Sequence, residues 1–213
     1  MATKMKQQKN RVKSFFREWI EPIVLGTVLA LFVRTFVLEI MKIPTGSMEP
    51  TLHGNPRSGD KVLVLKFSYW FQEPQRWDVM VFLFDKDTVS NPNFLGKVFG
   101  QKTEDGEVKE RKNFIKRIAG LPGEKIEIRD GKIWINGEMV EKPSSMQGKY
   151  YYNMGEYGEE GKVTEIPPNC YVVLGDNSRN SRDSRYWGFV ERKKIKGKAV
   201  VVLWPPNRWK VIR

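Results

Sequence analysis

The sequence has very few of the side chains that form disulfides or bind transition metals. Cys170 is the single cysteine and His53 the single histidine among 213 residues. One cysteine cannot form an intrachain disulfide, so the sequence neither requires nor excludes an oxidising compartment. Zinc sites usually combine several Cys and His ligands, and we therefore expect no metal centre of that kind.

The sequence also lacks an uninterrupted apolar run of the roughly 20 residues that a membrane-spanning helix needs. The run near the N-terminus, Ile23–Val33, has eleven residues. Extending it to 19–38 adds only two charged residues, Glu21 and Arg34, close to the two ends, where long side chains can reach the lipid headgroups. We predict a transmembrane anchor over 19–38. The alternatives are a buried amphipathic helix and a cleaved signal peptide, although no small-residue cleavage site follows the run.

Acidic residues are outnumbered, and the excess of positive charge is unevenly placed. Lys and Arg number 37 against 25 Asp and Glu, a net charge of +12. Half of that excess lies in residues 1–17, which contain no acidic residue but six basic ones: Lys4, Lys6, Lys9, Arg11, Lys13 and Arg17. Basic residues beside an apolar segment favour the cytoplasmic side, so 1–18 is predicted to be a cytoplasmic tail. A non-enzymatic protein that binds nucleic acid or anionic lipid is the alternative reading of this charge.

Beyond the anchor, the pattern predicts β structure. Apolar or alternating segments that predict strands occupy 61–65, 78–84, 125–129, 132–136, 170–174 and 198–204. Asp130-Gly131 between two of them predicts a type I′ hairpin turn. We expect a mainly β, antiparallel domain over 39–213, with a polar loop at 91–112 and a small inserted subdomain at 138–161.

A candidate nucleophile lies between Ile43 and Leu52. Pro44 and Pro50 bracket Gly46-Ser47, a combination typical of a stiff turn that could expose a serine hydroxyl. An ordinary surface turn has the same composition.

A serine nucleophile needs a base. His53 lies only six residues away and reads as a loop histidine. Lys116 is the other candidate: on an extended strand it shares a face with Phe114 and Ile118. Apolar neighbours would lower its pKa from the usual value of about 10.4 and so make it a usable base. The alternative is a lysine at a strand end that reaches solvent.

A third cluster, Gly175–Gly188, is a dense polar loop that follows a predicted strand. Its Asp, Arg and Ser side chains can pair with one another, or a hydroxyl can orient a distant amine. A surface turn with scattered charges is the alternative.

Together, in this order, the segments 43–52, 59–64, 116–124 and 175–188 resemble the sequence boxes of the bacterial type I signal peptidases. The resemblance extends from the anchor to about Val190. It implies a serine endopeptidase with Ser47 as nucleophile and Lys116 as general base. It also implies that Ser181 orients the lysine and that Thr45, where relatives often have serine, donates to the oxyanion. Archaeal and endoplasmic-reticulum relatives have histidine at the position of Lys116.

The resemblance assigns two further sets of residues. Substrate-pocket positions are Met41, Ile43, Leu52, Val62, Phe114 and Ile115. Structural positions near the site are Gly175, Asp176, Arg117, Asp183 and Arg185, with expected ion pairs between Asp183 and Arg185 and between Asp176 and Arg117.

The resemblance also implies partners and a location. The substrate would be an exported preprotein, bound as a strand beside Leu38–Ile43 and cleaved after small residues of an A-x-A type. Neither a metal nor an organic cofactor is implied, and nucleic acid is not an expected partner. The enzyme would be a single-pass protein of the bacterial cytoplasmic membrane, with its catalytic domain outside. A self-cleaving repressor with the same Ser/Lys chemistry is a further alternative, but it would need a DNA-binding domain before the nucleophile.

Overall fold

The computed structural model describes residues 16–85 and 112–212. The predicted loop at 91–112, except for Lys112, and most of the predicted tail at 1–18 lie outside these residues. The chain divides into two compact units, 1–39 and 40–213, which are described separately below.

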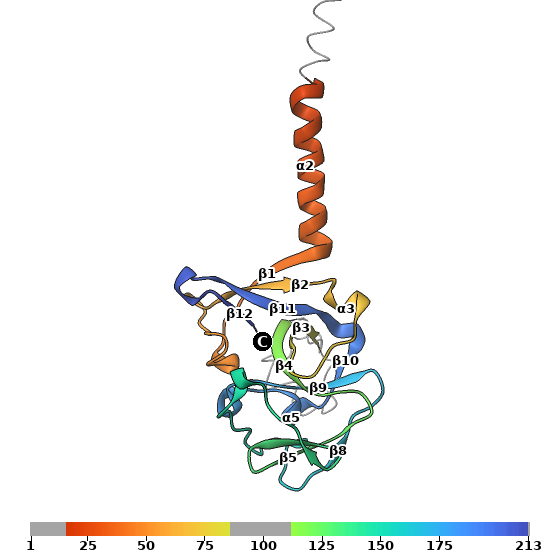
Figure 1. The fold of residues 1–213 in the computed structure, drawn as a ribbon, viewed down its shortest axis with the longest axis vertical. Coiled ribbons are helices and arrows are strands. Elements are labelled where there is room, and N and C mark those ends of the chain that lie inside the picture. Colours follow the sequence, from red (N-terminus) through yellow and green to blue (C-terminus); the bar gives the residue numbers. More distant parts are fainter. Residues whose placement is uncertain (1–15, 86–111, 213) are drawn as a thin grey trace, which may run out of the picture. The chain divides into compact units, whose positions relative to one another are not determined.

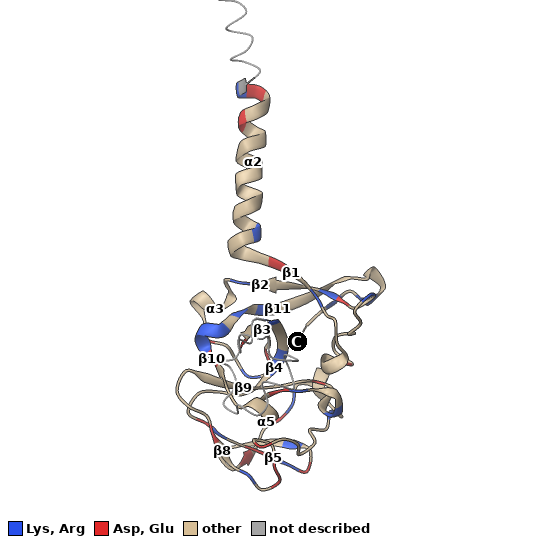
Figure 2. Ribbon diagram, turned by 180° about the vertical axis from the view of Figure 1, so that it is seen from behind, with Lys and Arg blue, Asp and Glu red and all other residues tan. Residues whose placement is uncertain are grey.

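The first unit contains a run of successive helical elements. They are η1 (Phe16–Ile20), α2 (Glu21–Phe32) and η2 (Val33–Val37). Pro22 lies in the first turn of α2, where its missing N–H is not needed. No side chain of α2 is buried, and the charged residues of this unit lie toward the two ends of the helix (Figure 2). The stretch Arg17–Val37 is 21 residues long and apolar enough to cross a membrane, which agrees with the predicted anchor at 19–38.

The second unit contains two β-sheets (Figure 1). The larger has the strand order β1-β2-β11-β3-β4-β9-β10, with β12 paired to β11. Its strands are β1 (Leu38–Lys42, of which Ile40 onward belongs to this unit), β2 (Lys61–Leu65), β3 (Val79–Phe84), β4 (Lys112–Gly120), β9 (Cys170–Leu174), β10 (Val190–Glu191), β11 (Ile195–Trp204) and β12 (Lys210–Val211). The pairs for which a register is defined in this sheet are all antiparallel.

The smaller sheet has the order β7-β6-β5-β8 and is also antiparallel. Its strands are β5 (Lys125–Arg129), β6 (Lys132–Ile135), β7 (Glu138–Met139) and β8 (Thr164–Glu165). Short helical turns connect the strands: η3 (Gly46–Met48), α3 (Ser68–Phe71), η5 (Ser144–Met146), η6 (Ser178–Asn180), α5 (Ser184–Trp187), η7 (Arg192–Lys194) and η8 (Pro206–Arg208). In both ribbon views β5 and β8 lie on the far side of β9 from β2 and β11 (Figures 1 and 2).

The mainly β, antiparallel fold predicted from the sequence is confirmed. The strands predicted at 61–65, 125–129 and 170–174 have the observed bounds, whereas β11 begins three residues earlier than expected, at Ile195. Asp130 and Gly131 have φ values of 50° and 69°, and these positive values are those that a type I′ turn requires.

The segment 138–161 is incorporated into the small-sheet region. Its first residues form β7, which pairs with β6, and the backbone N–H of Tyr151 donates to the carbonyl of Gly131 at 3.1 Å. Met146 and Tyr151 are buried in the core cluster beneath this sheet.

Strand β4 occupies the centre of the second unit because it contributes to all three core clusters. Ile115 packs with Met48 and Val81 in the first, Ile118 packs in the second, and Ala119 packs in the third. The strand that carries Lys116 is therefore fixed on both faces.

Trp187 of α5 is a large aromatic anchor of the second cluster. It has no exposed surface, and its ring centroid lies 4.7 Å from that of Phe84. Phe84 in turn stacks on Phe114 of β4, with centroids 4.6 Å apart. This contact chain links α5 to the strand that carries Lys116.

Replacing Trp187 by alanine should therefore lower the free energy of unfolding by about 3–5 kcal/mol, since it removes a fully buried aromatic side chain and leaves a cavity. Denaturant titration of the detergent-solubilised chain measures this change. Phe71→Ala is the matched control, because Phe71 is 85% exposed and its loss should change the unfolding free energy by less than about 0.5 kcal/mol. Equal losses in the two variants would contradict the assigned core.

Candidate active site

The candidate nucleophile lies on the short turn η3. Ser47 is buried there, and the turn is closed by a hydrogen bond from Glu49 N to Gly46 O at 3.2 Å. Asn177 holds the turn from the other side: its backbone N–H donates to Ser47 O at 3.0 Å, and its Nδ2 donates to Gly46 O at 3.1 Å. The position of the serine is therefore set by a residue 130 positions later in the chain.

Lys116 reaches this serine from the middle of β4. Its Nζ is hydrogen-bonded to Ser47 Oγ at 2.8 Å and to Ile115 O at 3.1 Å. The ring of Phe114, its neighbour on the same face, has its centroid 5.7 Å from Nζ. The Ser47–Lys116 separation lies within the range required for direct proton transfer between a nucleophile and its base.

The surroundings of Lys116 weaken its hold on a proton. The lysine is buried, and this desolvation lowers its pKa from 10.5 to about 8, against the opposing attraction of Asp183 and Asp176. Arg185 adds a smaller effect in the same direction as burial. With this pKa about one Lys116 in ten is uncharged at pH 7, compared with fewer than about one in a thousand for an ordinary lysine, and the uncharged amine can accept a proton from Ser47.

Thr45 lies beside the nucleophile. Its Oγ1 is 3.5 Å from Ser47 Oγ, and the residue is exposed. A hydroxyl in this position can donate to a negatively charged oxygen that forms next to Ser47.

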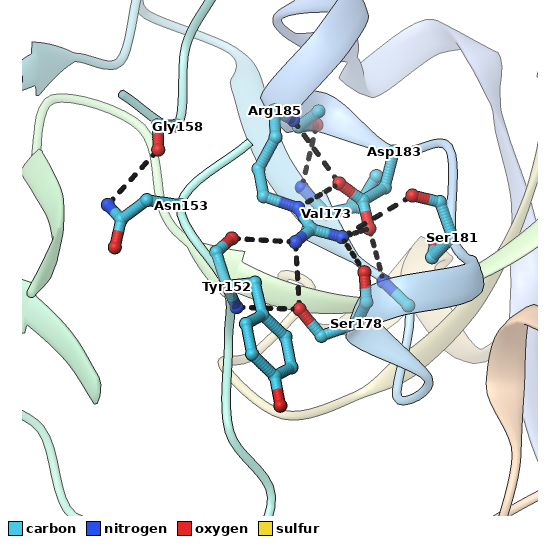
Figure 3. Close-up of polar contacts among 10 residues, drawn as sticks. Tyr152, Asn153, Gly158, Val173, Ser178, Ser181, Asp183 and Arg185 are labelled. Carbon is cyan, nitrogen blue, oxygen red and sulfur yellow. Dashed lines mark hydrogen bonds and ion pairs between the residues drawn. The ribbon is translucent and has the colours of Figure 1, made fainter. Parts of the chain in front are cut away.

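The loop after β9 is held by a buried ion pair. Asp183 binds Arg185 through two contacts of 2.8 Å, as the sequence predicts, and Asp183 also accepts from the backbone N–H of Gly175 at 2.9 Å (Figure 3). The remaining donors of Arg185 bind Ser178 and the carbonyl of Tyr152, each at 2.8 Å. The charge of Arg185 is therefore compensated even though the side chain is buried.

A second buried ion pair joins this loop to β4. Arg117 Nε and Nη2 contact the two oxygens of Asp176 at 2.9 and 2.8 Å, which is the expected pair in bidentate form. Asp176 Oδ2 also accepts hydrogen bonds from Thr51 Oγ1 and, at 2.6 Å, from Lys149 Nζ. Burial raises the pKa of Asp176, but hydrogen bonds and the charges of Arg117 and Lys149 outweigh it and hold the pKa below its usual value.

Ser181 lies close to Ser47. It is buried, and within the part of the chain that the structure describes its Oγ has no hydrogen-bond partner. The predicted hydrogen bond from Ser181 to Lys116 is thus not formed among the described residues. Gly175 brings the two serines together: a Cβ at this position would lie 2.1 Å from Ser181 Oγ and 2.5 Å from Ser47 O, so only glycine fits.

A cleft of about 550 Å³ opens in front of Ser47 and Lys116. Its walls come from the segments 41–47 and 112–116 and from Asn180 and Arg182. Among the predicted pocket residues, Met41, Ile43, Phe114 and Ile115 line this cleft.

The other two predicted pocket residues, Leu52 and Val62, have no exposed surface. Both belong to the core cluster that also contains Ile43 and Ile115. They are not among the residues lining the cleft, and we assign them to the layer beneath its wall. The sequence pattern identifies apolar positions near the site but does not separate the wall from the layer behind it.

Three site residues were not singled out from the sequence. Thr51 lies inside the nucleophile segment and Asn177 inside the polar loop, so both segments were identified while these two roles were not. Lys149 lies in the segment 138–161, which has no alternating pattern to indicate that one lysine faces the site.

His53 is half exposed and contacts Glu49 at 3.3 Å; Lys116, not His53, contacts Ser47. Within residues 16–85 and 112–212, no group of three His, Cys, Asp or Glu side chains is arranged to bind a metal ion.

One protein family and several known proteins are similar to this chain. The model of the family "Signal peptidase, peptidase S26" matches residues 16–204. A protein named probable signal peptidase I-2 from Synechocystis sp. is 37% identical over 193 residues, which are 89% of this chain and 75% of that protein. A signal peptidase I from Leptolyngbya laminosa is 39% identical over 191 residues, which are 90% of this chain and 81% of that protein. A solved signal peptidase I from Enterococcus faecalis is 27% identical and covers 60% of this chain and 97% of its own, with a TM-score of 0.40.

The lowered pKa of Lys116 makes the stability of the fold depend on pH. Unfolded Lys116 binds a proton below about pH 10.5, whereas folded Lys116 does so only below about pH 8. Between these values the unfolded state holds the extra proton, so this group's contribution to stability rises with pH across that window, by about 3 kcal/mol.

The difference in unfolding free energy between the wild type and Lys116→Met isolates this contribution, because Met cannot titrate and the other groups cancel. We expect the difference to rise in favour of the wild type between pH 8 and 10.5 and to be flat between pH 6 and 7.5. A pH-independent difference over the whole range would contradict a lowered pKa.

Asp183 should be important for stability because it compensates a buried guanidinium. Asp183→Ala leaves Arg185 buried without its carboxylate, and we expect a loss of about 3–5 kcal/mol in unfolding free energy. Glu191→Ala removes a partner of the more exposed Lys193 and serves as the control, with an expected change below about 1 kcal/mol. Thermal and denaturant unfolding measure both; a small effect of Asp183→Ala would show that Arg185 finds another partner.

Proposed function

The chain belongs to the signal peptidases of peptidase family S26, and we propose that it removes N-terminal signal peptides from exported preproteins as a membrane-anchored serine endopeptidase. The observation that carries the proposal is the 2.8 Å hydrogen bond between Ser47 Oγ and the Nζ of a buried Lys116. The two residues are 69 positions apart in the sequence.

In the proposed reaction, uncharged Lys116 takes the proton of Ser47 while Oγ attacks the carbonyl carbon of the scissile bond. The carbonyl oxygen becomes negatively charged and accepts hydrogen bonds from Thr45 Oγ1 and from the Ser47 backbone N–H. Loss of one such donor typically lowers the rate by about 10²–10³-fold. Lys116 then passes its proton to the leaving amine, and water releases the acyl group from Ser47.

The proposed role of Ser181 is to orient Lys116. Its support is the resemblance to the family and the burial of its hydroxyl beside Gly175, where an added Cβ would meet both Ser181 Oγ and Ser47 O. A buried hydroxyl with no partner in the described residues is available to bind the amine once the lysine changes its charge.

The substrate is proposed to add as a strand along β1. This strand is at the edge of the large sheet, and the cleft beside it is lined by Met41 and Ile43 together with Phe114 and Ile115. An extended peptide could gain backbone hydrogen bonds at such an edge, while shallow apolar walls favour small side chains before the cut.

The N-terminal unit supports the proposed location. We propose that residues 19–38 cross the bacterial cytoplasmic membrane, with the basic tail 1–18 in the cytoplasm and the catalytic domain, 39–213, outside. The support is a helix of suitable length and apolarity and the excess of basic residues before it. Residues 16–37 form one run of apolar helix, which does not favour the alternative of a repressor with a helix-turn-helix domain.

Cleavage of a preprotein with an A-x-A-type site, with the full chain in detergent or vesicles, tests the proposal. Ser47→Ala and Lys116→Ala should each lower kcat/KM by at least about 10³-fold, because each removes one member of the pair that makes and breaks the bond. Lys116→Arg should be equally inactive, since a guanidinium stays protonated.

His53→Ala is the matched control and should retain cleavage within about twofold, because Lys116 and not His53 contacts Ser47. Mass spectrometry of the product locates the cut. Cleavage by Lys116→Ala at the wild-type rate would refute the proposed base, and absence of cleavage by the wild type would refute the proposed function.

A further inference from the structure

The segment 138–161 contains a lysine, Lys149, that contacts two residues close to Ser47 and Lys116. Lys149 Nζ contacts Asp176 Oδ2 at 2.6 Å and Thr51 Oγ1 at 2.7 Å, and its side chain is only 9% exposed. Thr51 is four residues from the nucleophile, and Asp176 pairs with Arg117, the residue next to the base. Thr51 and Asp176 are themselves hydrogen-bonded and so link the Ser47 segment to Arg117 of β4. Lys149 contacts both of them.

The segment is held in place on two sides. On one side Tyr151 N donates to Gly131 O at 3.1 Å, and Lys142 Nζ binds the carbonyls of Gly131 and Lys149. On the other side Tyr152 N donates to Ser178 Oγ at 2.8 Å, and Arg185 binds the Tyr152 carbonyl (Figure 3). The backbone around Lys149 is consequently held by hydrogen bonds, although Gln147, Gly148 and Tyr150 beside it are exposed.

From this geometry we propose that Lys149 is a positioning residue for the Ser47–Lys116 pair, acting through Asp176 and Thr51. The proposal rests on the proposed function and assigns to the inserted segment a part in it. The charge of Lys149 balances the charge of Asp176. Its hydrogen bonds to Thr51 and Asp176 join the segment that follows Ser47 to the loop after β9.

The electrostatic consequence follows from counting the charges around the base. With Lys149 present, Asp176 faces two cations, Arg117 and Lys149. Without the lysine, the same carboxylate is balanced by Arg117 alone, and its attraction for a protonated Lys116 is less compensated. A protonated base is then favoured, so the pKa of Lys116 should rise and less of it is uncharged at pH 7.

The remaining charged groups do not change this sign. Those that act on Lys116 are Asp183, Asp176 and Arg185, while Lys112 and Arg182 line the cleft beside it. Those that act on Lys149 are Asp176, Arg117 and Lys210, and Lys142 binds its carbonyl. Burial lowers the pKa of Lys149 below its usual value, and the contact with Asp176 opposes this shift only in part.

The experiment compares the pH dependence of kcat/KM for the full chain and three variants at Lys149. Lys149→Gln keeps a donor but loses the charge, Lys149→Met loses both, and Lys149→Arg keeps the charge. We expect the acid limb of the profile to move to higher pH by about 0.5–1 unit in the Gln and Met variants, which lowers the rate at pH 7 by about three- to tenfold. KM should stay within about twofold, since Lys149 is not among the residues that line the substrate cleft.

Lys149→Arg should restore the wild-type profile. The control is Lys132→Gln, which removes an exposed lysine of the same small sheet and should leave the profile unchanged. Three results would overturn the proposal: wild-type pH profiles in both neutral variants, a change in KM alone, or loss of the fold in both neutral variants. Each would show that Lys149 does not position the catalytic pair or is needed only for folding.

A second readout does not depend on cleavage. The rate at which an amine-acylating reagent labels Lys116, followed by mass spectrometry across pH, reports the uncharged fraction of this lysine. We expect the labelling curve of Lys149→Gln to move to higher pH together with the activity profile. If the wild type cleaves no preprotein, the proposed function fails, but the labelling curve still tests whether Lys149 changes the pKa of Lys116. An unchanged labelling curve in Lys149→Gln overturns the proposed effect of Lys149 on Lys116.

Discussion

The catalytic unit depends on one interaction, the hydrogen bond between the buried amine of Lys116 and the hydroxyl of Ser47. The amine is useful as a base only while it is uncharged, and desolvation lowers its pKa enough for about one amine in ten to be uncharged at pH 7. The fold supplies that environment by placing Lys116 on β4, which is buried against core clusters on both faces. Buried ion pairs support the surroundings of this lysine.

That support consists of two buried carboxylates, each already paired with an arginine. Asp183 with Arg185 fixes the loop after β9, and Asp176 with Arg117 joins this loop to β4. Because both carboxylates are paired, they attract a proton on Lys116 less strongly than free carboxylates would. Structural rigidity and control of the lysine's charge therefore come from the same residues, and the segment that contains Lys149 extends this network to the small sheet.

The fold class and most strands could be predicted because their signals are local. Alternation along 125–136 and the Asp130-Gly131 turn predict a hairpin with the observed geometry. The ion pairs and the proposed catalytic pair were assigned from sequence boxes whose order resembles a known family; the expected ion pairs are observed, and Ser47 and Lys116 are hydrogen-bonded. Lys149 could not be found in this way, because its approach to Asp176 depends on how an irregular segment packs. Nor could burial of Leu52 and Val62 be distinguished from exposure in a pocket, since both environments require an apolar side chain.

The lowered pKa of Lys116 is the central claim, and a direct titration tests it. Carbon-13 NMR of lysine Cε in the full chain, with the Lys116 signal assigned by its loss in Lys116→Met, follows the protonation of this amine across pH. The account predicts a midpoint near pH 8, more than two units below that of a solvent-exposed lysine. A midpoint above pH 10 would mean that Lys116 is fully charged at neutral pH, and it would contradict the assignment of this residue as the base.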